Sequence, residues 1–299
     1  MYTYITSPFA TTLRKRRTDL ITGLASTGLV NRFPDAAPHD AIAEWLPRLA
    51  VDGFALAIGH TWDLPRVEDD LGALGLTFVT AHADKRIGSV LVDEPRQALA
   101  TLETNCRLAA TLGATIVVLH LWELPLGDRR LDENLVLLAD CLDIADACDV
   151  TLTVETIPAS VGSPLANVYR ALESDSRCRA TLDTEFLALH NELEAALEDD
   201  ALWACVSHVH VKDFDGTLRD RKGARRYLIP GEGTIDFEAV FDALRRYRYE
   251  SALTLEVSAV TADGRIDANR LREAEAWLGR RPWSLPFEVP ARRRQNARP

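Results

Sequence analysis

Short apolar runs rich in β-branched residues alternate with longer amphipathic stretches along most of this 299-residue chain. The runs lie at positions 20–26, 54–60, 76–82, 115–121, 151–156, 179–185, 206–212 and 252–258. The stretches between them have helical spacing, as in "QALATLETNCRLAATLGA" and "DFEAVFDALRRYRY", where Asp236 is the expected N-cap. Eight such strands with about eight helices predict an α/β fold, the (β/α)8 TIM barrel.

The alternative arrangement of the same elements is an open, doubly wound sheet. No GxGxxG follows the first run, and the "GEG" at 231–233 is too short for that fingerprint, which disfavours a dinucleotide-binding version. We expect one domain over residues 1–280, with its first strand near 20–26. Residues 281–299 are predicted to form a Pro/Arg-rich C-terminal tail that packs through Trp283 and Phe287.

Composition limits the classes of partner. The formal net charge of −11 argues against a nucleic-acid partner, and the basic clusters at 14–17 and 292–294 are expected to be solvated terminal charge. No apolar run approaches the roughly 18 residues of a membrane span, and the N-terminal basic cluster follows the apolar part, the reverse of a signal peptide. We therefore expect a cytoplasmic protein without a membrane partner. The five cysteines contain no CxxC pair, which disfavours a disulfide framework or thiolate zinc site.

Ionisable residues end six of the eight predicted strands. In a barrel these ends line the active site, and a lone charged residue in an apolar run either points into the mouth or is buried at high cost. Converging carboxylates repel one another unless a cation lies between them. Two Glu, one Asp and one His form a ligand set for one divalent ion, Mn²⁺, Mg²⁺ or Co²⁺, with Zn²⁺ left open. The six residues are His82, His120, Glu155, Asp183, His210 and Glu256.

The stretch "HVHVKD" at 208–213 contains a second histidine and a lysine beside the predicted ligand His210. Because side chains alternate across a strand, His208 and Lys212 face the same side as His210. We expect His208 to be a hydrogen-bonded core residue. Lys212 is predicted either to contact substrate or to form an ion pair with Asp213 or another residue of the mouth. The other candidate substrate contacts are His82, His120 and Trp122, whose ring either stacks on a sugar or packs in the core.

Several segments together carry a family resemblance. In order they are "TLTVETIP", "ATLDTEF", "HVHVKD", "PGEGTIDFEAVFDAL" and "ALTLEVS". The chain resembles, over roughly residues 20 to 278, the xylose-isomerase-like barrel superfamily of sugar phosphate isomerases and epimerases, which also includes endonuclease-IV-like enzymes. The resemblance implies a metal bound by Glu155, Asp183, His210 and Glu256. It also implies that Glu155 and Glu256 act as paired acid and base on opposite faces of the substrate carbon.

This sequence departs from the family pattern at two places. Many members have a histidine three residues after the strand-six aspartate, where this chain has Phe186. Endonuclease-IV-like members carry an extra Asp-x-His before the GEG segment, where Arg225 and Tyr227 stand here. The second departure disfavours a three-metal phosphodiesterase and leaves a one-metal site.

Four functions follow from these observations. The first is a metal-dependent isomerase or epimerase of a small sugar or polyhydroxylated carbonyl compound, which transfers a proton next to a carbonyl polarised by the metal. The second is a lyase of inosose or dehydroshikimate dehydratase type on the same scaffold. An endonuclease-IV-like phosphodiesterase and a non-catalytic binding relative are the third and fourth. The expected partner is a small-molecule substrate, and the resemblance also implies a homodimer.

Overall fold

The computed structural model describes residues 21–25, 40–59, 62–123, 127–221, 223, 225–261 and 265–280. The basic cluster at 14–17 and the predicted tail at 281–299, with Trp283 and Phe287, lie outside these residues. No helix within the described ranges is long and apolar enough to cross a membrane.

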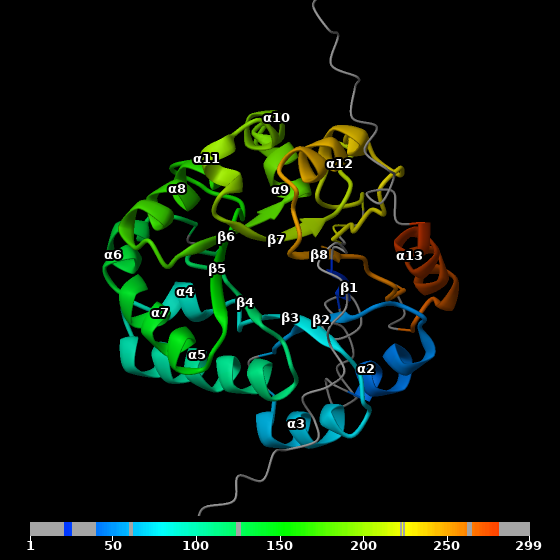
Figure 1. The fold of residues 1–299 in the computed structure, drawn as a ribbon, viewed down its shortest axis with the longest axis horizontal. Coiled ribbons are helices and arrows are strands. Elements are labelled where there is room, and N and C mark those ends of the chain that lie inside the picture. Colours follow the sequence, from blue (N-terminus) through cyan, green and yellow to red (C-terminus); the bar gives the residue numbers. More distant parts are fainter. Residues whose placement is uncertain are drawn as a thin grey trace, which may run out of the picture.

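Eight parallel strands close into a barrel, each paired with the next along the chain and the last paired with the first. Helices surround this ring (Figure 1). The predicted (β/α)8 barrel is therefore confirmed, and the open sheet is excluded. The strands are β1 (Ile21–Ala25), β2 (Phe54–Ala57), β3 (Phe78–His82), β4 (Ile116–Leu119), β5 (Thr151–Glu155), β6 (Arg179–Asp183), β7 (Val206–Val211) and β8 (Ala252–Leu255).

The observed strands end one to three residues before several of the predicted runs end. Ile58 and Leu121 lie just beyond β2 and β4, yet both side chains are fully or almost fully buried. A run of apolar letters thus continues past the last ladder hydrogen bond because the first residues of the connecting loops also pack over the barrel. An apolar run therefore predicts which residues are buried more accurately than it predicts the residue at which a strand ends.

The helices follow the strands in the expected alternation, with more interruptions than predicted. They are α2 (Asp40–Trp45), the 3-10 helix η1 (Leu46–Arg48), α3 (Leu64–Gly72), α4 (Ile87–Val90), α5 (Pro95–Thr111), α6 (Leu131–Val136), α7 (Leu138–Ala147), α8 (Pro164–Ser174), α9 (Thr184–Leu189), α10 (Leu193–Leu197), α11 (Asp200–Trp203), α12 (Phe237–Arg246) and α13 (Ala268–Arg280). The amphipathic stretch "LDENLVLLADCLDIADACD" at 131–149 is split between α6 and α7.

Local capping explains where several helices begin and end. Asp236 accepts hydrogen bonds from the backbone N–H groups of Glu238 and Ala239, so the expected N-cap of α12 is confirmed. The connection from β6 to β7 contains three short helices because Asp183 and Asp199 start α9 and α11 with their own side-chain caps. Asn191, with φ of 56°, turns the chain after α9.

A polar layer fills the barrel interior beneath the strand ends. Thr80, Thr153, Thr181 and Thr254 are completely buried, and each lies two residues before an ionisable residue of the same strand. The hydroxyls of Thr153 and Thr181 lie 2.6 Å apart. Because side chains two apart share a face of a strand, this layer places the ionisable residues above it inside the barrel.

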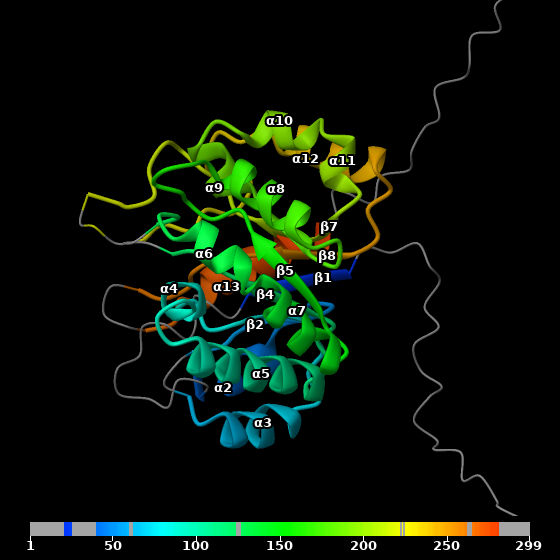
Figure 2. The same ribbon diagram turned by 90° about the vertical axis from the view of Figure 1, so that its left-hand side faces the viewer.

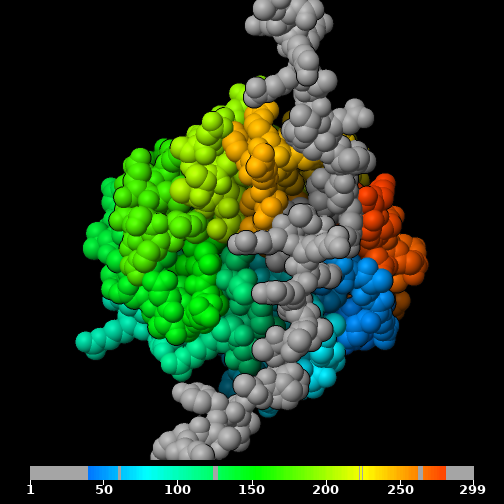
Figure 3. All heavy atoms as spheres, in the orientation of Figure 1, coloured from blue at the N-terminus to red at the C-terminus, as the bar shows by residue number. Residues whose placement is uncertain are grey.

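The colours follow the chain around the ring in the space-filling view, from blue and cyan through green to orange and red (Figure 3). Seen from the side, the connection between β7 and α12 projects from one end of the barrel (Figure 2). That connection follows the C-terminal end of a strand, so this end is the one that carries the ionisable residues.

Candidate active site

The four predicted metal ligands converge at the C-terminal ends of β5, β6, β7 and β8. His210 Nδ1 lies 2.7 Å from Glu155 Oε1, 3.9 Å from Asp183 Oδ2 and 3.8 Å from Glu256 Oε1. Ligand atoms of Glu155, Asp183 and His210 all lie within 4.8 Å of one another, an arrangement that can hold a metal ion. All four side chains are buried.

Two further histidines approach the other oxygen of Glu155. His82 Nε2 lies 3.1 Å and His120 Nε2 lies 2.7 Å from Glu155 Oε2, and the two ring nitrogens are 3.0 Å apart. These three residues form a second group that can hold a cation. His82 and His120, predicted as substrate contacts, therefore lie in the site and contact Glu155 directly. Their contact with substrate stays a prediction.

The site is strongly polarised because buried charges face one another. Burial alone raises the pKa of Glu155, but His210 and the hydrogen bonds from the histidines outweigh it and lower that pKa well below its usual value. Burial opposes the protonated form of His210, yet the charge of Glu155 raises its pKa overall. Burial lowers the pKa of His120 to about 3, so this ring is neutral at physiological pH.

Asp183 has the most ligand-like carboxylate of the set. It is fully buried, and burial raises its pKa against the charge of Lys212. Its Oδ1 caps α9 by accepting the N–H of Phe186 at 3.0 Å. Its Oδ2 forms no hydrogen bond of normal geometry and lies 2.5 Å from the ammonium of Lys212 as an ion pair. A buried carboxylate oxygen that already faces one cation is suited to face a metal ion.

Lys212 lies among the predicted ligands. Besides Asp183 Oδ2, its Nζ lies 2.6 Å from Glu256 Oε2 and 4.4 Å from the centre of the Phe186 ring. The expected ion pair is thus present, with Asp183 and Glu256 as its partners in place of Asp213. Its negative neighbours raise the pKa of Lys212 well above its usual value despite burial, so the side chain is a cation in the site.

Asp213 has a structural role instead. Its Oδ2 accepts the backbone N–H groups of Gly231 and Gly233, both at 2.8 Å, and its Oδ1 accepts that of Ile235 at 3.1 Å. Gly231 has φ of 103°, a conformation that favours glycine, and it makes the turn at the GEG segment. A Cβ on Gly233 would lie 2.5 Å from Asp213 Oδ1. Because these bonds bridge residues 213 and 231–235, Asp213 closes this loop onto the end of β7.

Glu185 and Arg225 form an ion pair beside Phe186 that the sequence pattern did not suggest. Arg225 Nη1 donates to Glu185 Oε1 at 2.8 Å, and a second bond joins Nη2 to Oε2. The Arg225 guanidinium also lies 4.8 Å from the centre of the Tyr227 ring. Arg225 and Tyr227 thus stand together at the place where a three-metal relative would have its extra ligands. The signal for Glu185 is its position two residues after Asp183, in the first turn of α9.

Two other predicted residues lie in the core. His208 is completely buried, and its Nε2 lies 2.8 Å from Thr254 Oγ1, so the expected hydrogen-bonded core histidine is confirmed. Trp122 is 1% exposed, and its Nε1 donates to the carbonyl of Pro158 at 3.1 Å. Trp122 therefore packs, and its predicted stacking on a sugar ring finds no open ring face here.

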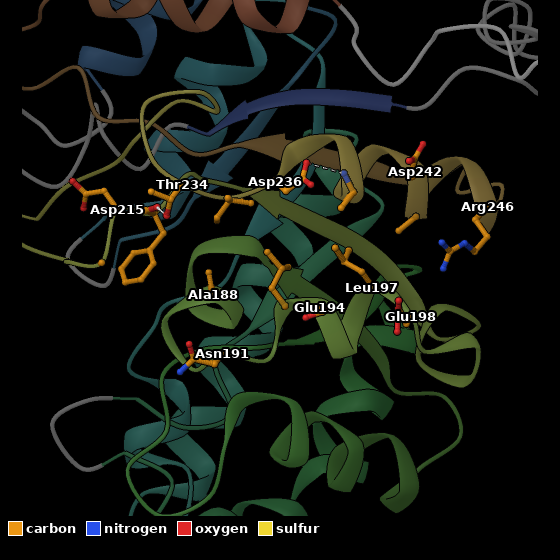
Figure 4. A pocket seen from close by; sticks show the side chains of 16 residues that line it. Ala188, Asn191, Glu194, Leu197, Glu198, Asp215, Thr234, Asp236, Asp242 and Arg246 are labelled. Carbon is orange, nitrogen blue, oxygen red and sulfur yellow. Dashed lines mark hydrogen bonds between the residues drawn. The ribbon is translucent and has the colours of Figure 1, made fainter.

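A separate hollow of about 730 Å³ lies between α10 and α12, on the outside of the barrel (Figure 4). Its walls combine apolar residues such as Leu197 with acidic ones such as Glu194, Glu198 and Asp242. None of its lining residues belongs to the strand-end cluster. The chemistry of the cluster thus belongs to the barrel mouth and not to this hollow.

Comparison with known proteins identifies the family of this barrel. Residues 55–280 match the model of the xylose isomerase-like TIM barrel family. A comparison with curated protein sequences finds no significant match.

Solved structures share the fold at low sequence identity. The 3-keto-D-glucoside 4-epimerase of E. coli aligns with a TM-score of 0.63 and 21% identity over 88% of this chain and 100% of the epimerase. The D-psicose 3-epimerase of Clostridium cellulolyticum aligns with a TM-score of 0.64 and 15% identity over 87% and 97%. A xylose isomerase domain protein of Alicyclobacillus acidocaldarius aligns with a TM-score of 0.64 and 19% identity over 88% and 98%.

Proposed function

The chain belongs to the xylose isomerase-like TIM barrel family, and on that basis we propose that it is a divalent-metal-dependent isomerase or epimerase. Its substrate is a small sugar or polyhydroxylated carbonyl compound. Epimerases of 3-keto-D-glucoside and D-psicose share its fold, which supports a substrate of this kind.

The observation that carries the proposal is the convergence of four buried ligand-type side chains at the barrel mouth. Glu155, Asp183 and Glu256 are all buried around His210. Three carboxylates and one imidazole are ligands for a hard or borderline divalent ion, and we propose Mn²⁺, Mg²⁺ or Co²⁺, with Zn²⁺ as the alternative. When bound there, the ion polarises a substrate carbonyl and so makes the neighbouring C–H more acidic.

Glu155 and Glu256 are the proposed acid and base. Both pKa values are lowered by neighbouring positive groups despite burial, so both carboxylates are ionised and able to accept a proton. Glu155 is held by His210 at one oxygen and by His120 at the other, and Glu256 is held by Lys212. Fixed orientation of both groups is what proton transfer to and from one carbon requires.

The Glu185–Arg225 pair favours this function over an endonuclease-IV-like phosphodiesterase. Arg225 and Tyr227 fill the place of the extra ligands with a cation and an aromatic ring. A guanidinium held on a buried carboxylate does not ligate a metal.

Metal binding is the first test. Calorimetric titration of the metal-free protein with Mn²⁺ is expected to show binding, and the ion is expected to raise the melting temperature. Glu155→Gln and Glu256→Gln remove one ligand charge each and should weaken binding. Glu198→Gln, in the outer hollow, is the matched control and should leave it unchanged. A protein whose melting temperature is indifferent to Mn²⁺, Mg²⁺, Co²⁺ and Zn²⁺ would count against the proposal.

The reaction class is tested by incubation with a panel of ketoses and inososes in D₂O. An isomerase or epimerase returns substrate and isomer that carry deuterium at the exchanged carbon. A dehydratase forms an enone or aromatic product instead, which ultraviolet absorption detects. Full exchange in the Glu155→Gln, Glu256→Gln double variant would rule out the assigned acid and base.

A further inference from the structure

The cations around the barrel mouth differ in how they are neutralised. Lys212 Nζ lies 2.6 Å from Glu256, Arg225 donates to Glu185 at 2.8 Å, and Arg86 Nη2 lies 3.4 Å from Asp84. Lys85 differs from these three. It follows β3 by three residues, is half-buried, and forms no ion pair or hydrogen bond with its side chain in the described ranges.

The charge of Lys85 nevertheless acts on the site. Burial raises the pKa of Glu123 to about 7 against the charge of Lys85. The ammonium group is therefore within electrostatic range of Glu123, which follows His120 by three residues at the end of β4.

The turn that carries Lys85 is fastened to the barrel from several sides. The N–H of Asp84 donates to Asn105 Oδ1 at 2.7 Å, and the N–H of Arg86 donates to Asp84 Oδ1 at 3.0 Å. Buried Asn134 donates to the carbonyls of Gly88 at 2.8 Å and Leu121 at 2.6 Å, which clamps α4 to the residue after His120. A solvated surface lysine does not need such a platform, whereas a preorganised binding group benefits from one.

Gly88 shows how closely α4 packs against the end of β4. A Cβ at Gly88 would lie 2.3 Å from the carbonyl oxygen of His120, so only glycine lets α4 pack directly on the end of β4. The turn that carries Lys85 is thus held beside the end of β4 by backbone packing.

The charge balance of the site points to the kind of group that Lys85 receives. With one divalent ion bound, the ion and two paired cations offset the four buried carboxylates, and Lys85 remains as a positive charge at the edge. The groups in this balance are Glu155, Asp183, Glu185, Glu256, Lys212 and Arg225. The half-buried Glu123, with its pKa near 7, is only partly ionised at neutral pH.

We propose that Lys85 binds an anionic group of the substrate, a phosphate or a carboxylate, while the sugar carbon reacts at the strand-end cluster. This inference rests on the proposed function and deepens it by naming the substrate class as anionic sugars. An ammonium that no described residue pairs with, on a rigid turn, can form charge-assisted hydrogen bonds to such a group without first breaking an ion pair to those residues.

The test compares D-fructose, D-fructose 6-phosphate and D-glucuronate by calorimetric titration of the full chain, with and without Mn²⁺. We expect at least one anionic sugar to bind more tightly than D-fructose. Lys85→Gln should weaken that binding on the order of 10- to 100-fold and leave D-fructose unchanged. Lys85→Arg should retain most of the preference, and the matched control Arg86→Gln should retain all of it. If D-fructose 6-phosphate binds more tightly than D-fructose, the bound group is a phosphate, and if D-glucuronate does, it is a carboxylate.

The result for Lys85 can be distinguished from the result for the proposed metal-dependent function. Equal affinity for neutral and anionic sugars, or an anion preference that survives in Lys85→Gln, would overturn the role of Lys85 even if Mn²⁺ binds and protons exchange. Failure of Mn²⁺ to bind would instead count against the proposed function. The measurement without metal would then decide the role of Lys85. If inorganic phosphate and both anionic sugars fail to bind the wild-type chain, the inference is wrong.

Discussion

His210 Nδ1 and Glu155 Oε1 lie 2.7 Å apart across the barrel mouth, although their strands β7 and β5 are separated by β6. The contact thus joins residues that are not neighbours in the sheet. Because both side chains are buried and of opposite charge, each stabilises the ionised form of the other. This pair is the centre of the proposed metal site.

Replacement of His210 by Gln is expected to remove most of the divalent metal affinity. The amide lacks the nitrogen lone pair of the imidazole, and Glu155 loses its charged partner. We expect Mn²⁺ affinity to fall on the order of 100-fold, measured by calorimetric titration. His190→Gln, at the end of α9, is the control because His190 lies outside the cluster. An unchanged affinity in the His210 variant would mean that the metal, if bound, lies elsewhere.

Loss of Arg225 is expected to destabilise the fold by roughly 3 kcal/mol, because it leaves the buried carboxylate of Glu185 without its bidentate partner. Urea unfolding of Arg225→Met measures this. The double variant with Glu185→Gln should recover part of the loss. Arg177→Gln is the control: Arg177 pairs with three aspartates on the surface, and we expect a clearly smaller loss of stability there. Equal effects at both arginines would contradict the prediction.

Alanine at Gly233 is expected to disrupt the GEG loop. The added Cβ would lie 2.5 Å from both Asp213 Oδ1 and the carbonyl oxygen of Phe214, so the loop must move and Asp213 must lose amide donors. We expect a lower melting temperature and weaker substrate binding. Gly279→Ala in α13 meets no atom within 4 Å and should be neutral or stabilise by up to about 1 kcal/mol. Similar melting temperatures for the two variants would refute this account of the loop.

The ionised carboxylate of Asp128 is expected to stabilise the fold at neutral pH, and this contribution is expected to be lost in acid. Burial would raise the pKa of Asp128, but Asn167 and the backbone N–H groups of Ser160, Val161 and Gly162 outweigh it and lower that pKa well below its usual value. The unfolded chain therefore binds the proton more readily than the folded one. The stabilisation is complete above the unfolded value and is lost as pH falls below it.

Asp128→Asn tests this linkage by urea unfolding at a series of pH values from 3 to 7. The variant should be less stable than the wild type at pH 7, and the difference should shrink as pH falls below about 4. A difference that stays constant across the series would show that ionisation of Asp128 does not contribute.

Much of the fold could be read from the sequence because the signals are local. Strands β2 to β8 are buried along almost their whole length, so each appears as a short apolar run, and eight such runs in alternation with helices specify a barrel. The candidate ligands stood out for a related reason: a residue such as Asp183, at the end of "ATLD", is costly to bury unless it has a function. The helix breaks at Leu137 and Asn191 were less visible because they depend on local caps and turns.

The strand ends that form the site, and the apolar runs that position them, were determined by the sequence alone. Only the tertiary structure decided which side chains meet: that Lys212 pairs with Asp183 and Glu256, and that Lys85 has no ion pair or hydrogen bond of its side chain among the described residues. The stagger of the closed sheet sets these contacts, as where Asp183 pairs in register with His210. Periodicity tells which face of a strand is buried, but the relative height of two strands depends on barrel closure, which no local pattern encodes.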